Sequence, residues 1–162
     1  MATTGIDSNF ITDAIIGASV AGGLILLSFI SPFISTIGIP SISQSVSGEL
    51  GRWLIVVLVA SIAEEIFFRE FILDFFDNKL KAFGLNLPFF LAAIISSILF
   101  SLFHFVAYNS SLSAAGGSFI SAALAGMVFA YSKKWTNSVI TPIVAHMVLN
   151  FYILSQLAVV IG

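Results

Sequence analysis

The sequence of 162 residues contains no cysteine and few charged side chains. Without cysteine, the protein can form neither a disulfide nor a thiolate metal site, and a cysteine nucleophile is excluded. Charged residues make up 9% of the chain and hydrophobic residues 59%, whereas an average soluble domain carries roughly 25% charged residues. So few charges cannot cover a water-facing surface, which predicts an integral membrane protein in contact with membrane lipid. A net charge of −2 without a basic run indicates no nucleic-acid partner.

Five apolar stretches are long enough to cross a bilayer as helices. A hydrocarbon core about 30 Å thick requires roughly 20 mostly apolar helical residues. The sequence therefore predicts an all-α fold, a polytopic membrane helix bundle of about five transmembrane helices, with residues 1–162 as a single membrane domain. The predicted spans are Ile11–Phe33, Trp53–Phe76, Pro88–Tyr108, Ser113–Tyr131 and Ser138–Val160. The predicted connectors are Ser31–Gly48, Asp77–Leu87, Asn109–Leu112 and Ser132–Asn137.

The basic residues of the connectors are distributed unevenly across the predicted membrane. Lys79, Lys81, Lys133 and Lys134 fall on the same side as the N-terminus, and only Arg52 falls on the opposite side. Because basic residues accumulate in cytoplasmic loops, this pattern predicts a cytoplasmic N-terminus. The cell (plasma) membrane is the default location for such a multi-pass protein, and an oligomer is left open.

Glycines within the predicted spans are candidates for close helix packing. Gly22, Gly23 and Gly126 are of this kind, since small residues let the backbones of membrane helices approach one another. The alternative, a general enrichment of glycine in spanning helices, is equally open.

The second predicted span contains ionisable residues that a membrane helix normally excludes. A charged side chain at the bilayer centre costs about 2.5–3.5 kcal/mol on insertion scales, so such residues indicate a functional site. Glu65 and Arg69 are four residues apart, the spacing of an ion pair on one helix face. Glu64 points to another side and has phenylalanine where a helical partner would stand, which predicts a general base. The alternative is that these residues only hold helices together.

The only two histidines of the chain, His104 and His146, both lie in predicted spans. Asn150 follows His146 by four residues, so the two side chains share one face of the last span. An imidazole and a carboxamide side by side offer hydrogen-bond donors to a developing oxyanion. Together with Glu64, these residues predict one buried polar site.

Three motifs, in order on three predicted spans, resemble one family. They are Glu-Glu-x-x-x-Arg at Glu64, Glu65 and Arg69, Phe-x-x-x-His at Phe100 and His104, and His-x-x-x-Asn at His146 and Asn150. The sequence resembles the CAAX protease and bacteriocin-processing (CPBP, or Abi) family of intramembrane endopeptidases over about residues 51–155, the motif-bearing core. The resemblance implies hydrolysis of a peptide bond in a membrane-associated peptide or lipidated protein substrate.

The resemblance also implies a role for each motif. Glu64 would activate the attacking water, with His104 helping to hold it, while Glu65 and Arg69 would order the site. The last motif would stabilise the tetrahedral oxyanion. The residues implied in catalysis are Glu64, Glu65, Arg69, His104, His146 and Asn150.

A metal ion is the alternative to catalysis by Glu64 alone. Glu64, His104 and His146 form the two-histidine, one-carboxylate set of a catalytic zinc site. However, the His-Glu-x-x-His signature is absent, and Asn150 beside His146 suits an oxyanion hole better than a ligand shell. We therefore expect that no cofactor is required, with a divalent metal such as zinc at these three residues as the alternative.

Two other classes of protein compete with a protease. Acids and histidines inside spans also form the proton relays of proton-coupled transporters, but five spans without an internal repeat offer no paired halves for alternating access. A non-catalytic immunity or binding membrane protein of the same fold is the other alternative. Because every motif residue is present, the sequence favours the enzyme.

Overall fold

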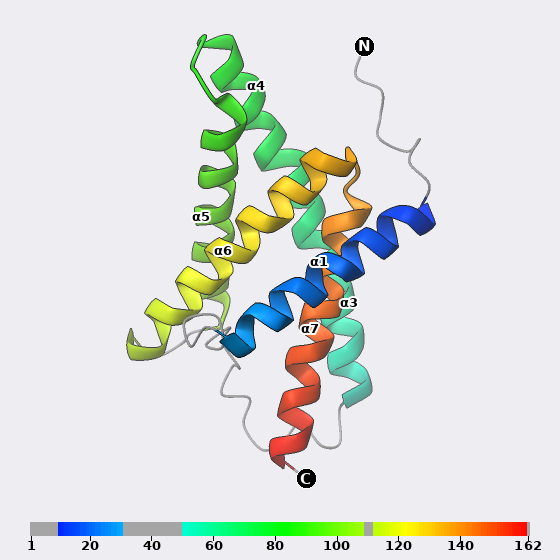
Figure 1. Cartoon of the computed structure of the whole chain (residues 1–162). Coiled ribbons are helices and arrows are strands. Elements are labelled where there is room, and N and C mark those ends of the chain that lie inside the picture. The colour runs from blue at the N-terminus through cyan, green and yellow to red at the C-terminus, as the bar shows by residue number, and fades with distance from the viewer. Residues whose placement is uncertain (1–9, 31–49, 109–111, 162) are drawn as a thin grey trace.

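The chain folds into helices that pack side by side. The computed structural model describes residues 10–30, 50–108 and 112–161. In chain order they form α1 (Phe10–Ile30), α3 (Leu50–Glu65), the π-helix η2 (Ile66–Leu73), α4 (Asp74–Ala82), α5 (Pro88–Tyr108), α6 (Leu112–Thr136) and α7 (Ile140–Ile161) (Figure 1). Every element within these ranges is helical, which confirms the predicted all-α fold.

Helices α3, η2 and α4 form one uninterrupted helical rod. The residues at its two junctions, Glu65 and Asp74, keep right-handed helical backbone angles. The connector predicted at Asp77–Leu87 therefore begins too early, because the helix continues to Ala82, while the connector's predicted end before Pro88 is confirmed. Asp77 and Lys81 are four residues apart and form an ion pair that supports the added turns.

The rod ends in a hydrogen-bonded turn that leads into α5. The Leu85 N–H donates to the Leu80 carbonyl at 3.2 Å, and the Gly84 N–H donates to the Lys81 carbonyl at 3.0 Å, the pattern of a Schellman motif. Gly84 has a φ of 68°, a left-handed conformation that glycine adopts without strain. Pro88 then opens α5, where a helix does not need the missing N–H.

Helix α6 also runs further than the sequence indicated. The connector predicted at Ser132–Asn137 begins too early, because the helix ends only at Thr136. The turn follows at Asn137, which has a φ of 52°, and the Ser138 hydroxyl oxygen accepts the N–H of Ile140 at the start of α7 at 3.2 Å. Two other predicted connectors lie wholly or largely outside the described residues, namely Ser31–Gly48 and Asn109–Leu112.

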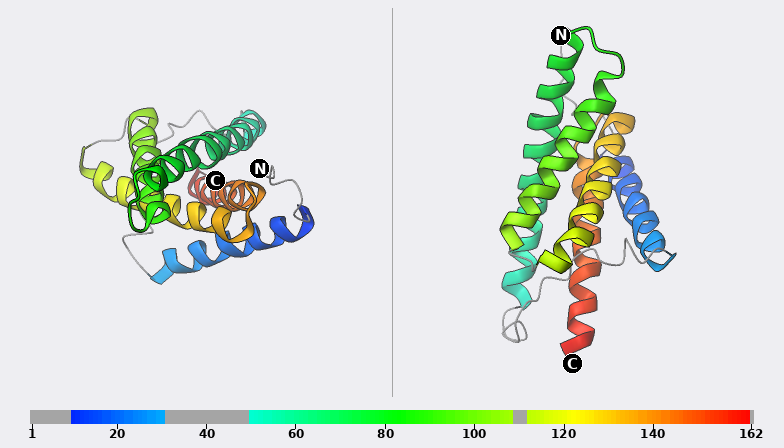
Figure 2. Two further views of the ribbon diagram at one scale, coloured as in Figure 1. Left: turned by 90° about the horizontal axis from the view of Figure 1, so that it is seen from above. Right: turned by 90° about the vertical axis from the view of Figure 1, so that its left-hand side faces the viewer.

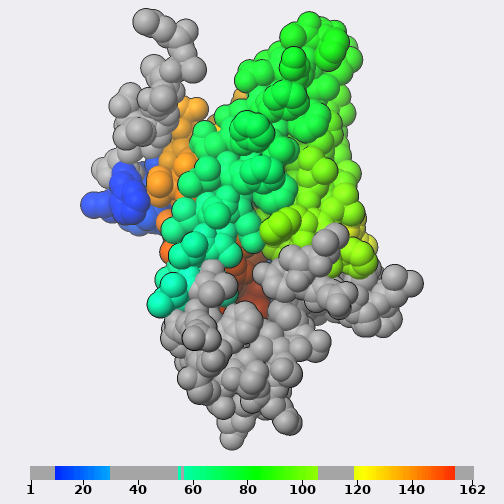
Figure 3. All heavy atoms as spheres, turned by 180° about the vertical axis from the view of Figure 1, so that it is seen from behind, coloured from blue at the N-terminus to red at the C-terminus, as the bar shows by residue number. Residues whose placement is uncertain are grey.

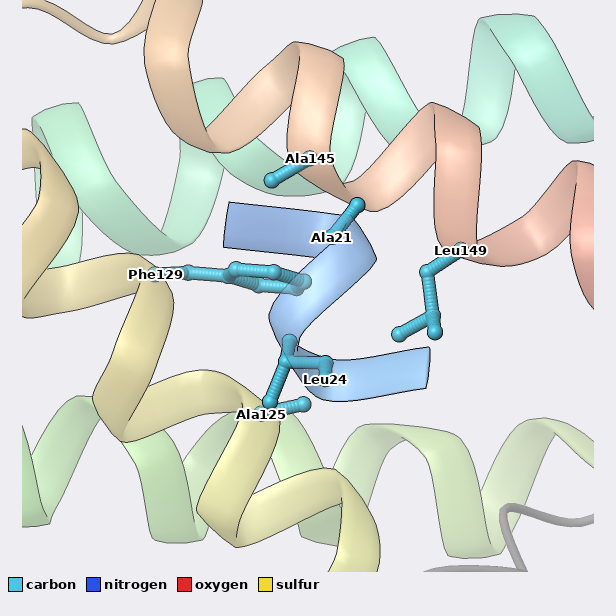
Figure 4. Close-up of a cluster of buried hydrophobic side chains, with 6 residues drawn as sticks. All are labelled: Ala21, Leu24, Ala125, Phe129, Ala145 and Leu149. Atoms are coloured by element: carbon cyan, nitrogen blue, oxygen red, sulfur yellow. The ribbon is translucent and has the colours of Figure 1, made fainter. Parts of the chain in front are cut away.

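Helix α1 packs on α6 and α7, on the side opposite the α3–η2–α4 rod (Figure 2). The three helices share a buried apolar cluster made of Ala21, Leu24, Ala125, Phe129, Ala145 and Leu149 (Figure 4). At the crossing of α1 and α7, a Cβ on Gly17 would lie 2.5 Å from the Thr141 carbonyl oxygen and 2.9 Å from Val144 Cβ. Only glycine lets these two backbones come so close.

The glycines predicted to mediate packing behave differently from one another. A Cβ on Gly126 would lie 3.1 Å from Ser97 Cβ, so the prediction is confirmed at the crossing of α5 and α6. The prediction is wrong for Gly22 and Gly23, because no described atom lies within 4 Å of a Cβ at either position. Gly17, which the sequence analysis missed, occupies the close crossing of α1 instead.

Two described segments are long and apolar enough to cross a membrane. They are Phe10–Phe29 and Pro88–Phe105, each with a mean hydropathy of 2.0. Ile140–Ser155 is apolar but shorter. The α3–η2–α4 rod carries ionisable residues through its second half, so its composition alone does not mark it as a span. Among the described residues, length and composition thus identify two of the five predicted spans.

Candidate active site

Three ionisable side chains from three helices meet at one point. Glu64 lies at the end of α3, His104 on α5 and His146 on α7. Glu64 Oε2 lies 3.6 Å from His104 Nε2 and 3.8 Å from His146 Nε2. One ligand atom from each residue lies within 4.8 Å of the other two. Residues far apart in the sequence therefore form one polar cluster.

Both imidazole rings of the cluster are held through Nδ1. His146 Nδ1 lies 2.9 Å from Glu65 Oε1, and His104 Nδ1 lies 2.9 Å from the Phe100 carbonyl oxygen. Because a carboxylate and a carbonyl can only accept, Nδ1 carries the proton in each ring. In each neutral ring the lone pair is then at Nε2, the nitrogen that faces Glu64.

Glu65 and Arg69 form the ion pair that their spacing predicts. Both side chains are 0% exposed, and Arg69 Nε lies 3.0 Å from Glu65 Oε2. Arg69 Nη1 also donates to Ser96 Oγ at 3.4 Å, and the Ser96 hydroxyl donates to the Phe68 carbonyl at 2.9 Å. Glu65 therefore connects a buried guanidinium to His146.

Aromatic rings enclose the charged groups. The Phe100 ring centroid lies 4.2 Å from that of His104 and 4.7 Å from Arg69 Cζ. The Phe129 ring stacks on the His146 ring with the centroids 5.4 Å apart. Both phenylalanines are buried, so they exclude water from their side of the cluster and offer ring faces to the guanidinium.

Asn150 contacts Ser61, which lies one helical turn before Glu65 on α3. Its Nδ2 donates to Ser61 Oγ at 2.9 Å, and the Ser61 hydroxyl donates to the Val57 carbonyl at 2.8 Å. Ser61 was not among the residues predicted from the sequence. The available signal was a small polar residue four positions before Glu65 in an otherwise apolar segment.

Lys133 ties α6 to the rod. Its Nζ lies 2.7 Å from both the Arg69 carbonyl oxygen and Asp74 Oδ2, and 3.5 Å from Glu70 Oε1. The Arg69 carbonyl belongs to the π-helix, in which backbone hydrogen bonds join residues five positions apart instead of four. Lys133, predicted as a connector residue, thus lies within α6 with a side chain only 12% exposed.

The three helices that carry the cluster also shape one face of the molecule. Figure 3 shows α7 at the base of a recess, with α3 on one side and α5 on the other. The recess lies on the face opposite the one seen in Figure 1.

The donor set fits a divalent metal ion. Four-coordinate zinc with bonds of about 2.0–2.2 Å separates its ligand atoms by roughly 3.3–3.6 Å. The distances from the Glu64 carboxylate oxygen to the two imidazole nitrogens are 3.6 and 3.8 Å. Metal-binding histidines generally donate their second N–H to a carboxylate or a backbone carbonyl, and both rings do so. The three ligand atoms lie within 4.8 Å of one another, a wider spacing than a bound zinc ion would give, so the donor types and the Nδ1 contacts, more than the distances, suit a metal ion.

One family of known proteins matches most of the chain. The family model described as type II CAAX prenyl endopeptidase Rce1-like matches residues 46–152, about two thirds of the sequence. The matched range includes all the motif residues from Glu64 to Asn150. No curated protein and no solved structure shows a significant match to the chain.

Proposed function

This chain belongs to the Rce1-like type II CAAX prenyl endopeptidase family, and from that membership we propose that it is an intramembrane endopeptidase acting on a prenylated or otherwise lipidated membrane substrate. One observation carries the proposal: the Glu64 carboxylate lies 3.6 and 3.8 Å from the Nε2 atoms of His104 and His146. A carboxylate between two imidazoles can hold and deprotonate a water molecule next to a peptide carbonyl.

Glu64 acts first as a base and then as an acid. It accepts a proton from water while the water oxygen bonds to the carbonyl carbon, and the carbonyl electron pair moves onto oxygen to give a tetrahedral oxyanion. Glu64 then returns the proton to the amide nitrogen as the C–N bond breaks. His104 accepts the other hydrogen of the water at Nε2. Its Nε2 carries the lone pair because its Nδ1–H donates a hydrogen bond to the Phe100 carbonyl.

His146 and Asn150 donate hydrogen bonds to the oxyanion. To donate through Nε2, the His146 ring must carry both protons, and Glu65, 2.9 Å from Nδ1, stabilises that cation. The two carboxylates of the cluster are then balanced by the Arg69 guanidinium and the imidazolium. A buried group of charges is far less costly when it is paired in this way.

A metal-dependent protease is the second candidate, favoured by the Nδ1 contacts of both histidines. Glu64, His104 and His146 would hold the ion, which when bound supplies a Lewis acid for the carbonyl and an activated water. Elemental analysis of the purified protein separates the two candidates. Stoichiometric metal that is lost in His104→Ala supports the metal site, whereas full cleavage by metal-free protein supports Glu64 alone.

The same proposal places the helices in a membrane as one polytopic domain with the N-terminus in the cytoplasm. The turns between α4 and α5 and between α6 and α7 lie toward the same end of the molecule, which supports a common side for Lys79, Lys81, Lys133 and Lys134 (Figure 1). Because the chain has no cysteine, a single Lys79→Cys substitution can be labelled selectively in oriented vesicles. Labelling only from the outer face would contradict this orientation.

Cleavage of a farnesylated CAAX peptide by purified protein in lipid nanodiscs tests the function. Glu64→Gln keeps the size of the side chain but cannot accept a proton, so cleavage is expected to fall at least about 100-fold. Glu70→Gln is the matched control, since Glu70 lies on the same rod, is 45% exposed and contacts Lys133 rather than a histidine.

The remaining outcomes distinguish the other classes of protein. Cleavage that survives in Glu64→Gln would refute the proposed base. Proton flux into liposomes without any cleavage would favour the transporter, and neither activity in the unaltered protein would favour the non-catalytic binding protein.

A further inference from the structure

On the basis of the function proposed above, we propose that Ser61 is a positioning residue that orients the Asn150 carboxamide toward the oxyanion. Ser61 lies outside the three motifs, and its side chain is fully buried within α3. Burial of a hydroxyl is costly unless it is hydrogen-bonded. Both the hydrogen and a lone pair of Ser61 are engaged, and the second partner is Asn150.

The Val57 carbonyl fixes the direction of the hydrogen bonds at Ser61. A carbonyl oxygen only accepts, so the Ser61 hydroxyl donates its single hydrogen to Val57 at 2.8 Å. Ser61 Oγ can then only accept from Asn150, at 2.9 Å. This chain of two hydrogen bonds selects the nitrogen of the carboxamide, rather than its oxygen, as the end that faces α3.

The hydrogen bond between Ser61 and Asn150 lies one helical turn from a second hydrogen bond between α3 and α7. The second joins Glu65 to His146, also at 2.9 Å. In each helix the two residues are four positions apart, so they occupy successive turns of one face. Two residues on successive turns of α3 thus hold the two proposed oxyanion donors: Ser61 holds Asn150, and Glu65 holds His146.

Asn150 Nδ2 has two N–H bonds, and Ser61 accepts only one of them. The other is fixed in the plane of the same carboxamide and remains to donate to the oxyanion. Without Ser61, the carboxamide can turn about its last rotatable bond and present its oxygen, which repels an oxyanion. Loss of Ser61 therefore lowers the fraction of molecules with a correctly oriented donor and leaves the donor itself in place.

Steady-state cleavage of the farnesylated CAAX peptide by four proteins tests the inference: the unaltered chain, Ser61→Ala, Asn150→Ala and the double variant. Ser61→Ala is expected to lower kcat by about 3- to 10-fold, the range for one neutral hydrogen bond, with KM unchanged. Asn150→Ala is expected to lower kcat by about 100-fold, as for a lost oxyanion donor. The double variant should match Asn150→Ala, because Ser61 then has nothing to orient.

Two further variants separate orientation from general packing. Ser61→Thr keeps the hydroxyl and should retain most of the activity. Ser101→Ala removes an equally buried serine whose hydroxyl joins α5 to the Phe119 carbonyl of α6, and should leave kcat within about twofold of the unaltered chain. Thermal unfolding of each variant checks that it is folded.

These variants distinguish a failure of the role proposed for Ser61 from a failure of the oxyanion role proposed for Asn150. Equal losses from Ser61→Ala with and without Asn150 would overturn the inference, since Ser61 would then act independently. A loss in Asn150→Ala but none in Ser61→Ala would also overturn it and leave the proposed function intact. Full activity in Asn150→Ala would instead remove the oxyanion role on which the inference depends.

Discussion

Replacement of Arg69 by methionine would remove the guanidinium that pairs with the buried Glu65 carboxylate and leave the two carboxylates of the cluster with one cation too few. The two side chains are 0% exposed, with Arg69 Nε and Glu65 Oε2 3.0 Å apart. Removing one partner of a buried ion pair costs about 3–5 kcal/mol, because an unpaired charge remains. Methionine still fills space beside Phe100 and Phe129, whose ring centroids lie 4.7 and 5.8 Å from Arg69 Cζ. We therefore expect the free energy of unfolding to fall by roughly 3–5 kcal/mol.

The double variant Glu65→Gln with Arg69→Met separates stability from activity. Because both charges are gone, it should recover at least about 2 kcal/mol relative to Arg69→Met alone. Cleavage should nevertheless stay low, since a neutral glutamine cannot stabilise the doubly protonated His146 ring. Stability would then recover in the double variant, while cleavage would stay low.

The assay is an unfolding titration of detergent-solubilised protein with SDS, followed by tryptophan fluorescence, alongside peptide cleavage. The chain has two tryptophans to report the transition. Arg69→Lys keeps the charge but loses the planar fork, so it should lie between the unaltered chain and Arg69→Met. An Arg69→Met variant that unfolds within about 0.5 kcal/mol of the unaltered chain, or a double variant no more stable than the single one, would contradict a stabilising ion pair at this position.

Two more predictions concern the packing of the helices. Gly17→Ala should lower the free energy of unfolding by about 1–3 kcal/mol, because its Cβ would lie 2.5 Å from a carbonyl oxygen of α7. Gly22→Ala, with open space around the added Cβ, should leave the free energy of unfolding unchanged or slightly raised in the same SDS titration. Lys133→Met should lower the free energy of unfolding by about 1–2 kcal/mol, because it loses the 2.7 Å contact with Asp74. Lys134→Met, at an exposed position, should have little effect. Equal effects of the two substitutions would contradict the structure.

The helices themselves could be predicted from the sequence because their apolar runs are long, but their ends could not. The segment from Asp77 to Ala82 is polar and resembles a loop in composition. Its helicity depends on an ion pair within the segment and on packing of the rod against α5, whose buried contact includes Leu73 with Ala92 and Ala93. Composition reports none of these contacts.

In the candidate site, contacts within one helix could be predicted from the sequence, and contacts between helices could not. Glu65 and Arg69 pair within one helix, so their spacing was sufficient to predict the contact. The contact of Glu65 with His146 depends on the register of α3 against α7, which no local pattern encodes. For the same reason Gly17, rather than Gly22, could be identified only once the crossing of α1 and α7 was known.

Phe100 serves its neighbours through two different parts of the residue. Its main-chain oxygen accepts from His104 Nδ1 at 2.9 Å, while its ring lies 4.7 Å from Arg69 Cζ. Any amino acid at position 100 would supply the oxygen, since one helical turn brings it to the imidazole. Only an aromatic one also turns an electron-rich face to the guanidinium. The spacing of the Phe-x-x-x-His motif is therefore a requirement of helix geometry, and the aromatic residue in it is a requirement of electrostatics. Substitution of Phe100 by tyrosine would preserve both the hydrogen bond to His104 and the ring contact with the guanidinium. Substitution by leucine would preserve only the hydrogen bond.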